Sequence, residues 1–424
     1  MGRTHTGRLR AAGALTTLVT AAALSCALPA HAAPPPPPEG RVLGAAAPGA
    51  VGGSYIVTLK GSSGASTGAG RAIAAKYGAH ISRTYATALN GYAVRVDAEG
   101  AGQLAADPAV ASVVQDTAVS LDDGEGGSWS GGGGGGNSQV GGVADRTAPP
   151  DPASQTQPRA QAQDQAPAWP PGQGAGVTAY VIDTGVRTTH REFGGRASSG
   201  WDFVDDDADA EDGSGHGTHV AATLAGATYG VAKRADVVAV RVLDDHGVGT
   251  TAQVIAGIDW VARNARRPAV ANLSLGGAAN PELDQAVRNA IAAGVTFTVA
   301  AGNEGAPAAR FSPARVPEAV TVGASDRDGA RAAFSNWGAA LDLFAPGVSV
   351  TSAWNTDDTA TRTLTGTSMA APYAAGAAAL YLGGHPSAAP AEVSDALVAR
   401  SATGRIGNAG PGSPDRLLQV TGQD

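Results

Sequence analysis

Three polar side chains with complementary chemistry stand at the ends of apolar segments. Asp183 follows the apolar run 177–182, His216 opens a helical pattern between two glycines, and Ser368 precedes an apolar helical stretch that reaches Tyr381. An imidazole can take the proton of a serine hydroxyl, and a carboxylate can hold that imidazole in the required tautomer. A carboxylate buried at a strand end is itself costly without such a partner. Together these residue types indicate a serine nucleophile and acyl-transfer chemistry.

Each of these residues also has an ordinary structural explanation. An aspartate often turns a strand into a loop, and a serine at a helix start is often only an N-cap. His216 and His219 stand three residues apart, which also suits a metal site. However, the sequence has no His-Glu-x-x-His motif and no third ligand at a suitable spacing. The interpretation therefore depends on the whole set and not on any one member.

Asn303 adds a hydrogen-bond donor that acyl transfer requires. The segment Ala300-Ala301-Gly302-Asn303 ends another apolar strand. The side-chain amide of Asn303 and the backbone N–H of Ser368, at the positive end of a helix dipole, suit the negative oxygen that forms when a carbonyl is attacked. A turn-forming Gly-Asn pair is the structural alternative.

The elements that must position these residues alternate between strand and helix. Short, nearly continuous apolar runs are typical of strands buried on both faces of a parallel sheet. They cover residues 177–182, 237–242, 270–275, 295–300 and 320–322, with helical patterns at 251–262 and 283–292. The fold class predicted for residues 173–424 is α/β, a doubly wound and mostly parallel sheet. Function is then expected in loops at the carboxyl ends of the strands.

A smaller unit, residues 54–121, precedes this domain. Its pattern predicts strand, helix, strand, strand, helix and strand, at residues 55–59, 71–77, 81–85, 92–96, 98–106 and 110–115. This βαββαβ order is that of small ferredoxin-like α+β domains, which serve many functions.

The remaining segments predict export and processing. Residues 1–32 combine a positive start, an apolar stretch and an Ala-His-Ala cleavage site, as in a signal peptide. Residues 33–53 form a Pro/Gly/Ala-rich spacer, and residues 122–172 form a Gly/Pro/Gln-rich linker. We expect a secreted, extracellular protein that has no contact with the membrane once the signal peptide is removed.

The composition argues against nucleic acid as a partner and against disulfide bonds in the mature protein. The formal net charge of −8, with 16% charged residues, gives no electrostatic reason to expect nucleic acid. The single cysteine, Cys26, lies in the signal peptide, so the mature protein would have no disulfide. A lipidated Cys26 is the alternative, but the residues 23–25 before it depart from the lipoprotein pattern.

Five segments resemble the subtilisin family of serine peptidases, and in particular its proteinase K-like branch. They lie at residues 179–185, 215–220, 272–277, 300–303 and 366–370, within a region of similarity that spans 174–418. The chain order Asp183, His216, Asn303, Ser368 is also the order of that family. The resemblance implies a serine endopeptidase with Asp183, His216 and Ser368 as catalytic triad and Asn303 as oxyanion donor. The small domain resembles the inhibitory propeptide of such enzymes, which implies a self-processed zymogen.

The resemblance also implies where a substrate and calcium would bind. Ser274-Leu275-Gly276 should pair with an extended polypeptide as an added strand, and Ala300-Ala301-Gly302 should line the pocket for the residue before the cut. Because that pocket sequence is small and apolar, we expect broad specificity with an apolar or aromatic preference.

Asp342, with the carbonyls of Pro317 and Ala319, corresponds to a structural calcium site, and an ordinary aspartate turn is the alternative. No cofactor is expected for the chemistry itself.

Several positions depart from the family pattern. In the histidine and serine helices these are Ala222, Ala371, Tyr373 and Ala374, whereas Pro372 follows the pattern. Positions that carry disulfide cysteines in relatives are here Gly213 with Asp245 and Ala309 with Ala340. We therefore expect lower stability than in such relatives, by about 2–5 kcal/mol for each missing bridge.

Two other functions fit parts of the pattern. An α/β-hydrolase would carry its nucleophile in a similar Gly-Thr-Ser segment, but the chain order of its triad is serine, acid, histidine. The only histidine after Ser368 is His385, and no suitable pair of acid and histidine follows the serine. A catalytically inactive subtilisin-like protein that binds peptides is the second alternative. We expect a monomer that takes polypeptide substrates, has its own propeptide as inhibitor and chaperone, and is most active at neutral to alkaline pH.

Overall fold

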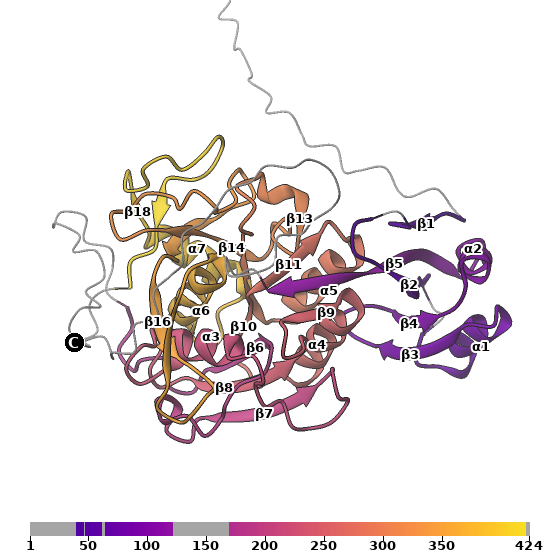
Figure 1. The fold of residues 1–424 in the computed structure, drawn as a ribbon, viewed down its shortest axis with the longest axis horizontal. Coiled ribbons are helices and arrows are strands. Elements are labelled where there is room, and N and C mark those ends of the chain that lie inside the picture. Colours follow the sequence, from indigo (N-terminus) through magenta and orange to yellow (C-terminus); the bar gives the residue numbers. More distant parts are fainter. Residues whose placement is uncertain (1–39, 46, 62–63, 122–168, 421–424) are drawn as a thin grey trace, which may run out of the picture. The chain divides into compact units, whose positions relative to one another are not determined.

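The computed structural model describes residues 40–121, apart from 46, 62 and 63, and residues 169–420. The expected signal peptide and most of the expected linker lie outside these ranges. Within them, a small α+β domain precedes a large α/β domain (Figure 1). No helix of the described ranges has the length and apolar character needed to cross a bilayer.

The small domain has the predicted ferredoxin-like order. Its elements are β1 (Val42–Leu43), β2 (Ala50–Leu59), α1 (Gly68–Lys76), β3 (His80–Tyr85), β4 (Gly91–Arg95), α2 (Ala98–Ala105) and β5 (Val110–Leu121). Strands β2 to β5 pair antiparallel in the order β5-β2-β4-β3. The side chains of Thr67 and Asp97 cap the two helices by accepting hydrogen bonds from backbone N–H groups of their first turns. The two helices and the sheet enclose a separate apolar core.

Two strands of the small domain extend beyond their predicted limits. Strand β1 and the first residues of β2 fall in the stretch 33–53 that we expected to be a spacer. They are held there because Val42 pairs with Val113 of β5 and Ala50 pairs with Thr117. Strand β5 continues to Leu121, past the predicted end at 115, because its last residues find strand partners in the large domain.

Within the described ranges, the large domain has a central sheet of nine strands, and further strands lie outside this sheet. The elements of the whole domain are β6 (Thr178–Asp183), β7 (Ala197–Asp202), α3 (His216–Ala225), β8 (Asp236–Arg241), β9 (Val248–Thr250), α4 (Thr251–Asn264), β10 (Ala269–Leu273), β11 (Leu275–Ala278), α5 (Pro281–Ala292), β12 (Thr296–Ala300), β13 (Phe311–Ser312), β14 (Val320–Ser325), β15 (Leu343–Pro346), β16 (Val350–Ala353), β17 (Thr361–Leu364), α6 (Thr367–Gly384), α7 (Pro390–Ala399), β18 (Ala402–Thr403) and β19 (Arg416–Leu417). The central sheet has the order β18-β19-β15-β14-β12-β10-β6-β8-β7, and its pairs from β7 to β19 are parallel. Strands β6, β10 and β12 are buried at every residue, as their apolar runs predict.

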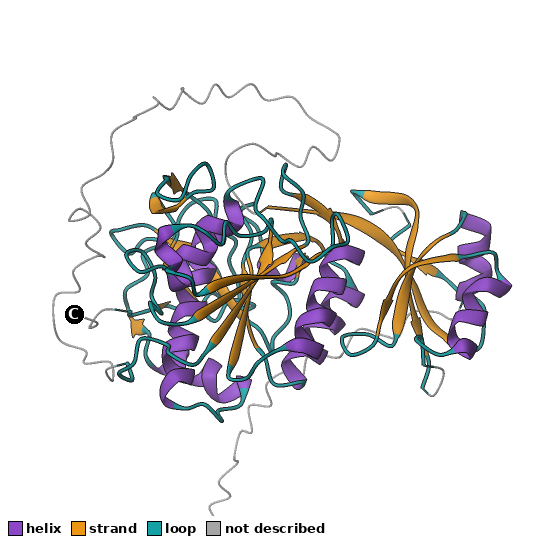
Figure 2. Ribbon diagram, turned by 90° about the horizontal axis from the view of Figure 1, so that it is seen from below, coloured by secondary structure: helices purple, strands orange, loops and turns teal. Residues whose placement is uncertain are grey.

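Helices cover both faces of this sheet (Figure 2). Helices α3, α6 and α7 share one apolar core with the sheet, and α4 and α5 share a second core. Small residues let α3 and α6 approach closely: a Cβ at Gly376 of α6 would lie 2.6 Å from Cβ of Val231 and 3.0 Å from the carbonyl oxygen of Leu224 in α3. The predicted doubly wound α/β class is confirmed, and so is the small α+β domain before it.

Candidate active site

The expected acid and base meet where β6 ends and α3 begins. Asp183 is the last residue of β6 and His216 is the first residue of α3. Nδ1 of His216 lies 2.7 Å from Oδ1 of Asp183, and both side chains are buried, with 1% and 0% of their surface exposed. The backbone N–H of Thr184 donates to the same carboxylate oxygen at 2.7 Å. A proton on Nδ1 in this hydrogen bond leaves Nε2 as the basic nitrogen of the imidazole.

The expected nucleophile, Ser368, is the second residue of α6. Pro372 lies inside this helix, four residues later, and has no N–H to give to the carbonyl of Ser368. The hydroxyl of Ser274 donates to that carbonyl instead, at 2.7 Å, and the hydroxyl of Ser368 donates to the carbonyl of Ser274 at 3.2 Å. The chain between β10 and β11 therefore replaces the helical hydrogen bond that proline removes.

Asn303 is held against the residue before the serine. Its Oδ1 accepts hydrogen bonds from the backbone N–H and the hydroxyl of Thr367, at 2.9 and 3.0 Å. Gly302, which has φ +103°, donates its N–H to the same hydroxyl at 3.1 Å. With Oδ1 held in this way, the NH₂ group of Asn303 is the end of the amide that points away from Thr367.

The structure does not support a metal pair on α3. Nε2 of His219 lies 3.0 Å from the carbonyl oxygen of Val350, and Nδ1 of His216 is engaged by Asp183. Burial lowers the pKa of His219 to about 3, so this imidazole is neutral. Among the described residues, no group of three histidine, cysteine or acidic side chains is placed to hold a metal ion.

The expected substrate strand is paired with the end of the small domain. Strand β5 runs antiparallel to β11, with Leu121 opposite Leu275 and Ser120 opposite Gly276. On its other side it pairs antiparallel with β9 over Ala118, Val119 and Ser120. The backbone N–H of Leu121 also donates to the carbonyl of Gly247, at 3.0 Å. The chain's own β5 thus lies in the groove between β9 and β11 as an added strand.

The segment expected to line the specificity pocket follows β12 directly. Ala300 and Ala301 are buried, and the carbonyl of Ala301 accepts a hydrogen bond from Nδ2 of Asn336 at 2.9 Å. A Cβ at Gly302 would lie 2.1 Å from that same amide nitrogen, so only glycine fits there. The segment therefore has a backbone that packs closely against Asn336, and it has no large side chain.

The expected calcium ligand Asp342 contacts strand β14, which begins directly after the expected carbonyl ligands. Its Oδ2 accepts the backbone N–H of Thr321 at 2.7 Å, two residues after the buried Ala319, whereas Pro317 is exposed. Burial raises the pKa of Asp342 to about 6. A carboxylate is an oxygen donor of the kind that calcium prefers.

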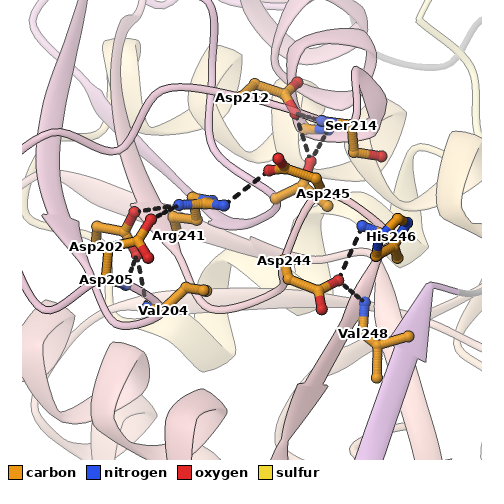
Figure 3. Close-up of polar contacts among 12 residues, drawn as sticks. Asp202, Val204, Asp205, Asp212, Ser214, Arg241, Asp244, Asp245, His246 and Val248 are labelled. Carbon is orange, nitrogen blue, oxygen red and sulfur yellow. Dashed lines mark hydrogen bonds and ion pairs between the residues drawn. The ribbon is translucent and has the colours of Figure 1, made fainter.

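The departures from the family pattern are accommodated by packing. Ala222 is fully buried in the core shared by α3 and α6, and Tyr373 packs against the same core. At one of the missing disulfides, Asp245 fills the space beside Gly213, where a Cβ would lie 2.0 Å from its carboxylate. Asp245 accepts a hydrogen bond from Arg241, at 2.8 Å (Figure 3).

Comparisons with known proteins find relatives of both domains. The model of the Subtilase family matches residues 174–418, and the model of peptidase inhibitor I9 matches residues 54–122. The Extracellular serine proteinase of Thermus sp. (strain Rt41A) is 46% identical over 341 residues, which are 80% of this chain and 78% of that protein. The Alkaline serine exoprotease A of Vibrio alginolyticus is 54% identical over 245 residues, which are 58% of this chain and 45% of that protein.

A solved structure shows the same fold. It is the crystal structure of a cold adapted subtilisin-like serine proteinase, with a TM-score of 0.58 and 51% sequence identity, and it covers 60% of this chain and 92% of its own. The family match spans more than half of the chain, and the relative from Thermus is similar over 80% of it. The chain therefore belongs to the subtilase family of serine endopeptidases and carries an inhibitor I9 domain ahead of its peptidase domain.

Proposed function

We propose that this protein is a secreted serine endopeptidase, made as a zymogen, with Asp183, His216 and Ser368 as its catalytic triad. The observation that carries the proposal is the buried hydrogen bond of 2.7 Å between Asp183 and His216. Secretion is supported by the name of the relative from Thermus, an extracellular proteinase, and by the signal-like residues 1–32, which lie outside the described residues.

The proposed mechanism is acyl transfer. His216 takes the proton of the Ser368 hydroxyl as Oγ attacks the peptide carbonyl, and Asp183 stabilises the imidazolium that forms. The backbone N–H of Ser368 and the side-chain amide of Asn303 donate hydrogen bonds to the oxyanion. His216 then protonates the leaving amine, and a water molecule hydrolyses the acyl-enzyme.

Inhibition in the zymogen is proposed to come from the last residues of β5. They occupy the groove between β9 and β11 with the backbone pairing that a substrate strand would make. The linker begins directly after Leu121, the last residue of β5. We place the self-processing cut at the start of the linker, soon after Leu121, and not near its end at residue 172.

Carboxylates of the peptidase domain hold the small domain in place. Oδ1 of Asp259 in α4 accepts three backbone N–H groups from residues 86–88, at 3.0, 2.7 and 2.8 Å. Glu282 in α5 accepts the hydroxyls of Thr58 and Ser112, at 2.8 and 2.5 Å. These charge-assisted bonds would hold β5 in the groove until the chain is cut and the small domain leaves.

The substrate class is proposed to be unfolded or extended polypeptide with loose sequence demands. Main-chain pairing along Ser274-Leu275-Gly276 supplies affinity without reading side chains. The buried alanines 300 and 301, with Gly302, leave an apolar wall for the residue before the cut. We expect apolar and aromatic residues to be preferred at that position.

A structural calcium ion is proposed at Asp342, with the carbonyls of Pro317 and Ala319. Calcium should raise the stability of the inactive Ser368→Ala chain by about 2.7 kcal/mol when it exceeds its dissociation constant 100-fold. Thermal unfolding in calcium and in EDTA measures this gain. Asp342→Asn should remove it, whereas Asp326→Asn, at another aspartate that accepts turn N–H groups, should keep it. Equal unfolding temperatures with and without calcium would contradict the proposal.

The test of the main proposal is expression of the full chain beside its Ser368→Ala variant. Both are followed by intact mass and by casein hydrolysis, with and without phenylmethylsulfonyl fluoride. We expect the unmodified chain to cut itself soon after Leu121 and to digest casein. The variant should stay at full length and show no casein hydrolysis. If both fold and stay whole without hydrolysis, the endopeptidase proposal fails and a peptide-binding role replaces it.

A further inference from the structure

A buried carboxylate that sequence reasoning passed over lies four residues before His216. Asp212 ends the acidic stretch ahead of α3 and has only 4% of its surface exposed. Its two oxygens accept five hydrogen bonds. In each of them the carboxylate is the acceptor, so none of the bonds needs a protonated Asp212. The only local signal in the sequence is an acid that precedes a glycine-rich turn and a helix start.

Three of the five bonds come from the backbone around the start of α3. Oδ1 accepts the N–H groups of Ser214, at 3.0 Å (Figure 3), and Gly215, at 2.8 Å. Oδ2 accepts the N–H of Thr218, at 2.8 Å, and also its hydroxyl, at 2.6 Å. A carboxylate at this end of the helix is favoured by the helix dipole. These contacts set the direction in which α3 leaves the turn, and with it the position of its first residue, His216.

The fifth bond ties the same carboxylate to the catalytic aspartate's strand. Oγ1 of Thr184 donates to Oδ1 of Asp212 at 2.8 Å and accepts the backbone N–H of Gly217 at 2.9 Å. The backbone N–H of Thr184 in turn donates to Asp183. The loop after β6 and the first turn of α3 are thereby locked together.

The two backbones also touch at this point. A Cβ at Gly217 would lie 2.0 Å from the carbonyl oxygen of Gly185, so the chain segments are in direct contact. Such close packing can keep two segments adjacent, but the hydrogen bonds through Thr184 and Asp212 decide their relative rotation. A small rotation of α3 would lengthen or bend the bond between Asp183 and His216.

We infer that Asp212 is a positioning residue for the catalytic base, acting with Thr184 to align His216 with Asp183. This inference rests on the proposed function. The five hydrogen bonds of the Asp212 carboxylate go to Thr184 and to residues 214–218, and none of them goes to the groove strands β9 and β11. Its loss should therefore lower kcat and leave KM nearly unchanged. General-base catalysis depends steeply on alignment, because small displacements of a catalytic group cost large factors in rate.

The test compares three variants in the full chain, allowed to mature and counted by active-site titration: Asp212→Ala, Asp212→Asn and Thr184→Val. With a chromogenic peptide substrate, we expect kcat per titrated site to fall at least tenfold for Asp212→Ala, and less for Asp212→Asn, which keeps one acceptor oxygen. Thr184→Val has nearly the same shape as threonine and should fold, and it should lower kcat about as much as Asp212→Asn. KM should change less than twofold in all three.

A second measurement does not need activity. In the Ser368→Ala chain, the proton in the bond between Asp183 and His216 should give a resolved downfield NMR signal. We expect Asp212→Asn and Thr184→Val to shift or broaden that signal. This readout remains available if a variant fails to mature.

The matched control is Asp202→Asn. Asp202 is equally buried and accepts two turn N–H groups and a bond from Arg241 (Figure 3), but its carboxylate makes none of its bonds with α3. Its variant should lose stability while kcat per titrated site stays within twofold. If the Asp212 and Thr184 variants also keep kcat within twofold and leave the NMR signal in place, the inference is wrong. An unmodified chain without activity would instead overturn the proposed function, and the NMR comparison would still decide the positioning role.

Discussion

At the scale of single residues, Ser274 supplies a hydrogen bond that helix α6 cannot make for itself. Pro372 removes the N–H that would serve the carbonyl of Ser368, and the hydroxyl of Ser274 serves it instead. Ser274 is itself oriented by Asn272, whose Nδ2 donates to its hydroxyl at 2.9 Å. The backbone of Ser368, the proposed nucleophile, is thus held by a chain of hydrogen bonds from the central sheet.

Ser274→Ala should therefore weaken both stability and catalysis. A buried carbonyl left without its donor costs about 1–3 kcal/mol in the free energy of unfolding, and a looser first turn of α6 should lower kcat several-fold. Urea unfolding of the Ser368→Ala chain measures the first effect, and kcat per titrated site measures the second. Ser401→Ala, which removes a buried hydroxyl bond to a helical carbonyl in α7, should cost stability alone. An unchanged kcat for Ser274→Ala would contradict this role.

At the scale of elements, helix α3 is buried along its whole length and carries an imidazole that cannot easily be charged. Burial lowers the pKa of His219 to about 3, while the ordinary value for an unfolded histidine is about 6.5. Between these two values the unfolded chain binds a proton that the folded chain does not. Stability carried by this group is therefore full above pH 6.5 and is lost as the pH falls toward 3.

His219→Gln should make the fold less sensitive to acid. Each pH unit below 6.5 costs the unmodified fold up to about 1.4 kcal/mol through this imidazole, and glutamine removes that dependence while keeping a donor for the carbonyl of Val350. The free energy of unfolding of the Ser368→Ala chain, measured between pH 7 and 5, should thus have a smaller slope in the variant. The exposed His385→Gln serves as control. Parallel pH curves for all three proteins would show that His219 is not the responsible group.

At the scale of the whole molecule, the two domains are joined by buried polar contacts as well as by strand pairing. Asp259 alone accepts three backbone N–H groups of the small domain, and its other oxygen accepts a bond from Arg263 at 2.9 Å. Because one carboxylate accepts three backbone N–H groups, its removal should affect how long the inhibitor domain stays bound.

Asp259→Ala should shorten the life of the inhibited complex. Three N–H groups would lose their acceptor on docking, so the small domain should bind at least tenfold more weakly after the chain is cut. We expect casein hydrolysis to appear earlier after self-processing, with the final kcat unchanged. Arg263→Gln changes the other contact of Asp259 and should keep the lag of the unmodified protein. A lag that is the same in Asp259→Ala would exclude this anchor.

The sequence by itself determined most of the central strands of both domains and the order of the chemistry. Buried strands were predictable because they need continuous apolar runs, and the βαββαβ order was predictable because its strands alternate. Asp183, His216, Asn303 and Ser368 were each found at a strand end or helix start, since that placement leaves a local pattern. The predictions that fell short concern strand ends whose partners are distant in the sequence: β1 and the start of β2 pair with β5, and the end of β5 pairs with β9 and β11.

Only the tertiary structure decided what supports those residues. Ser274 and Ser368 are 94 residues apart, and Thr184 and Asp212 are 28 apart. The pairing itself leaves no local pattern in the sequence, because serine, threonine and aspartate in loops serve turns and caps equally well. The pairing of β5 with β9 and β11 was likewise outside the reach of the sequence, because it joins backbone groups that are more than 120 residues apart.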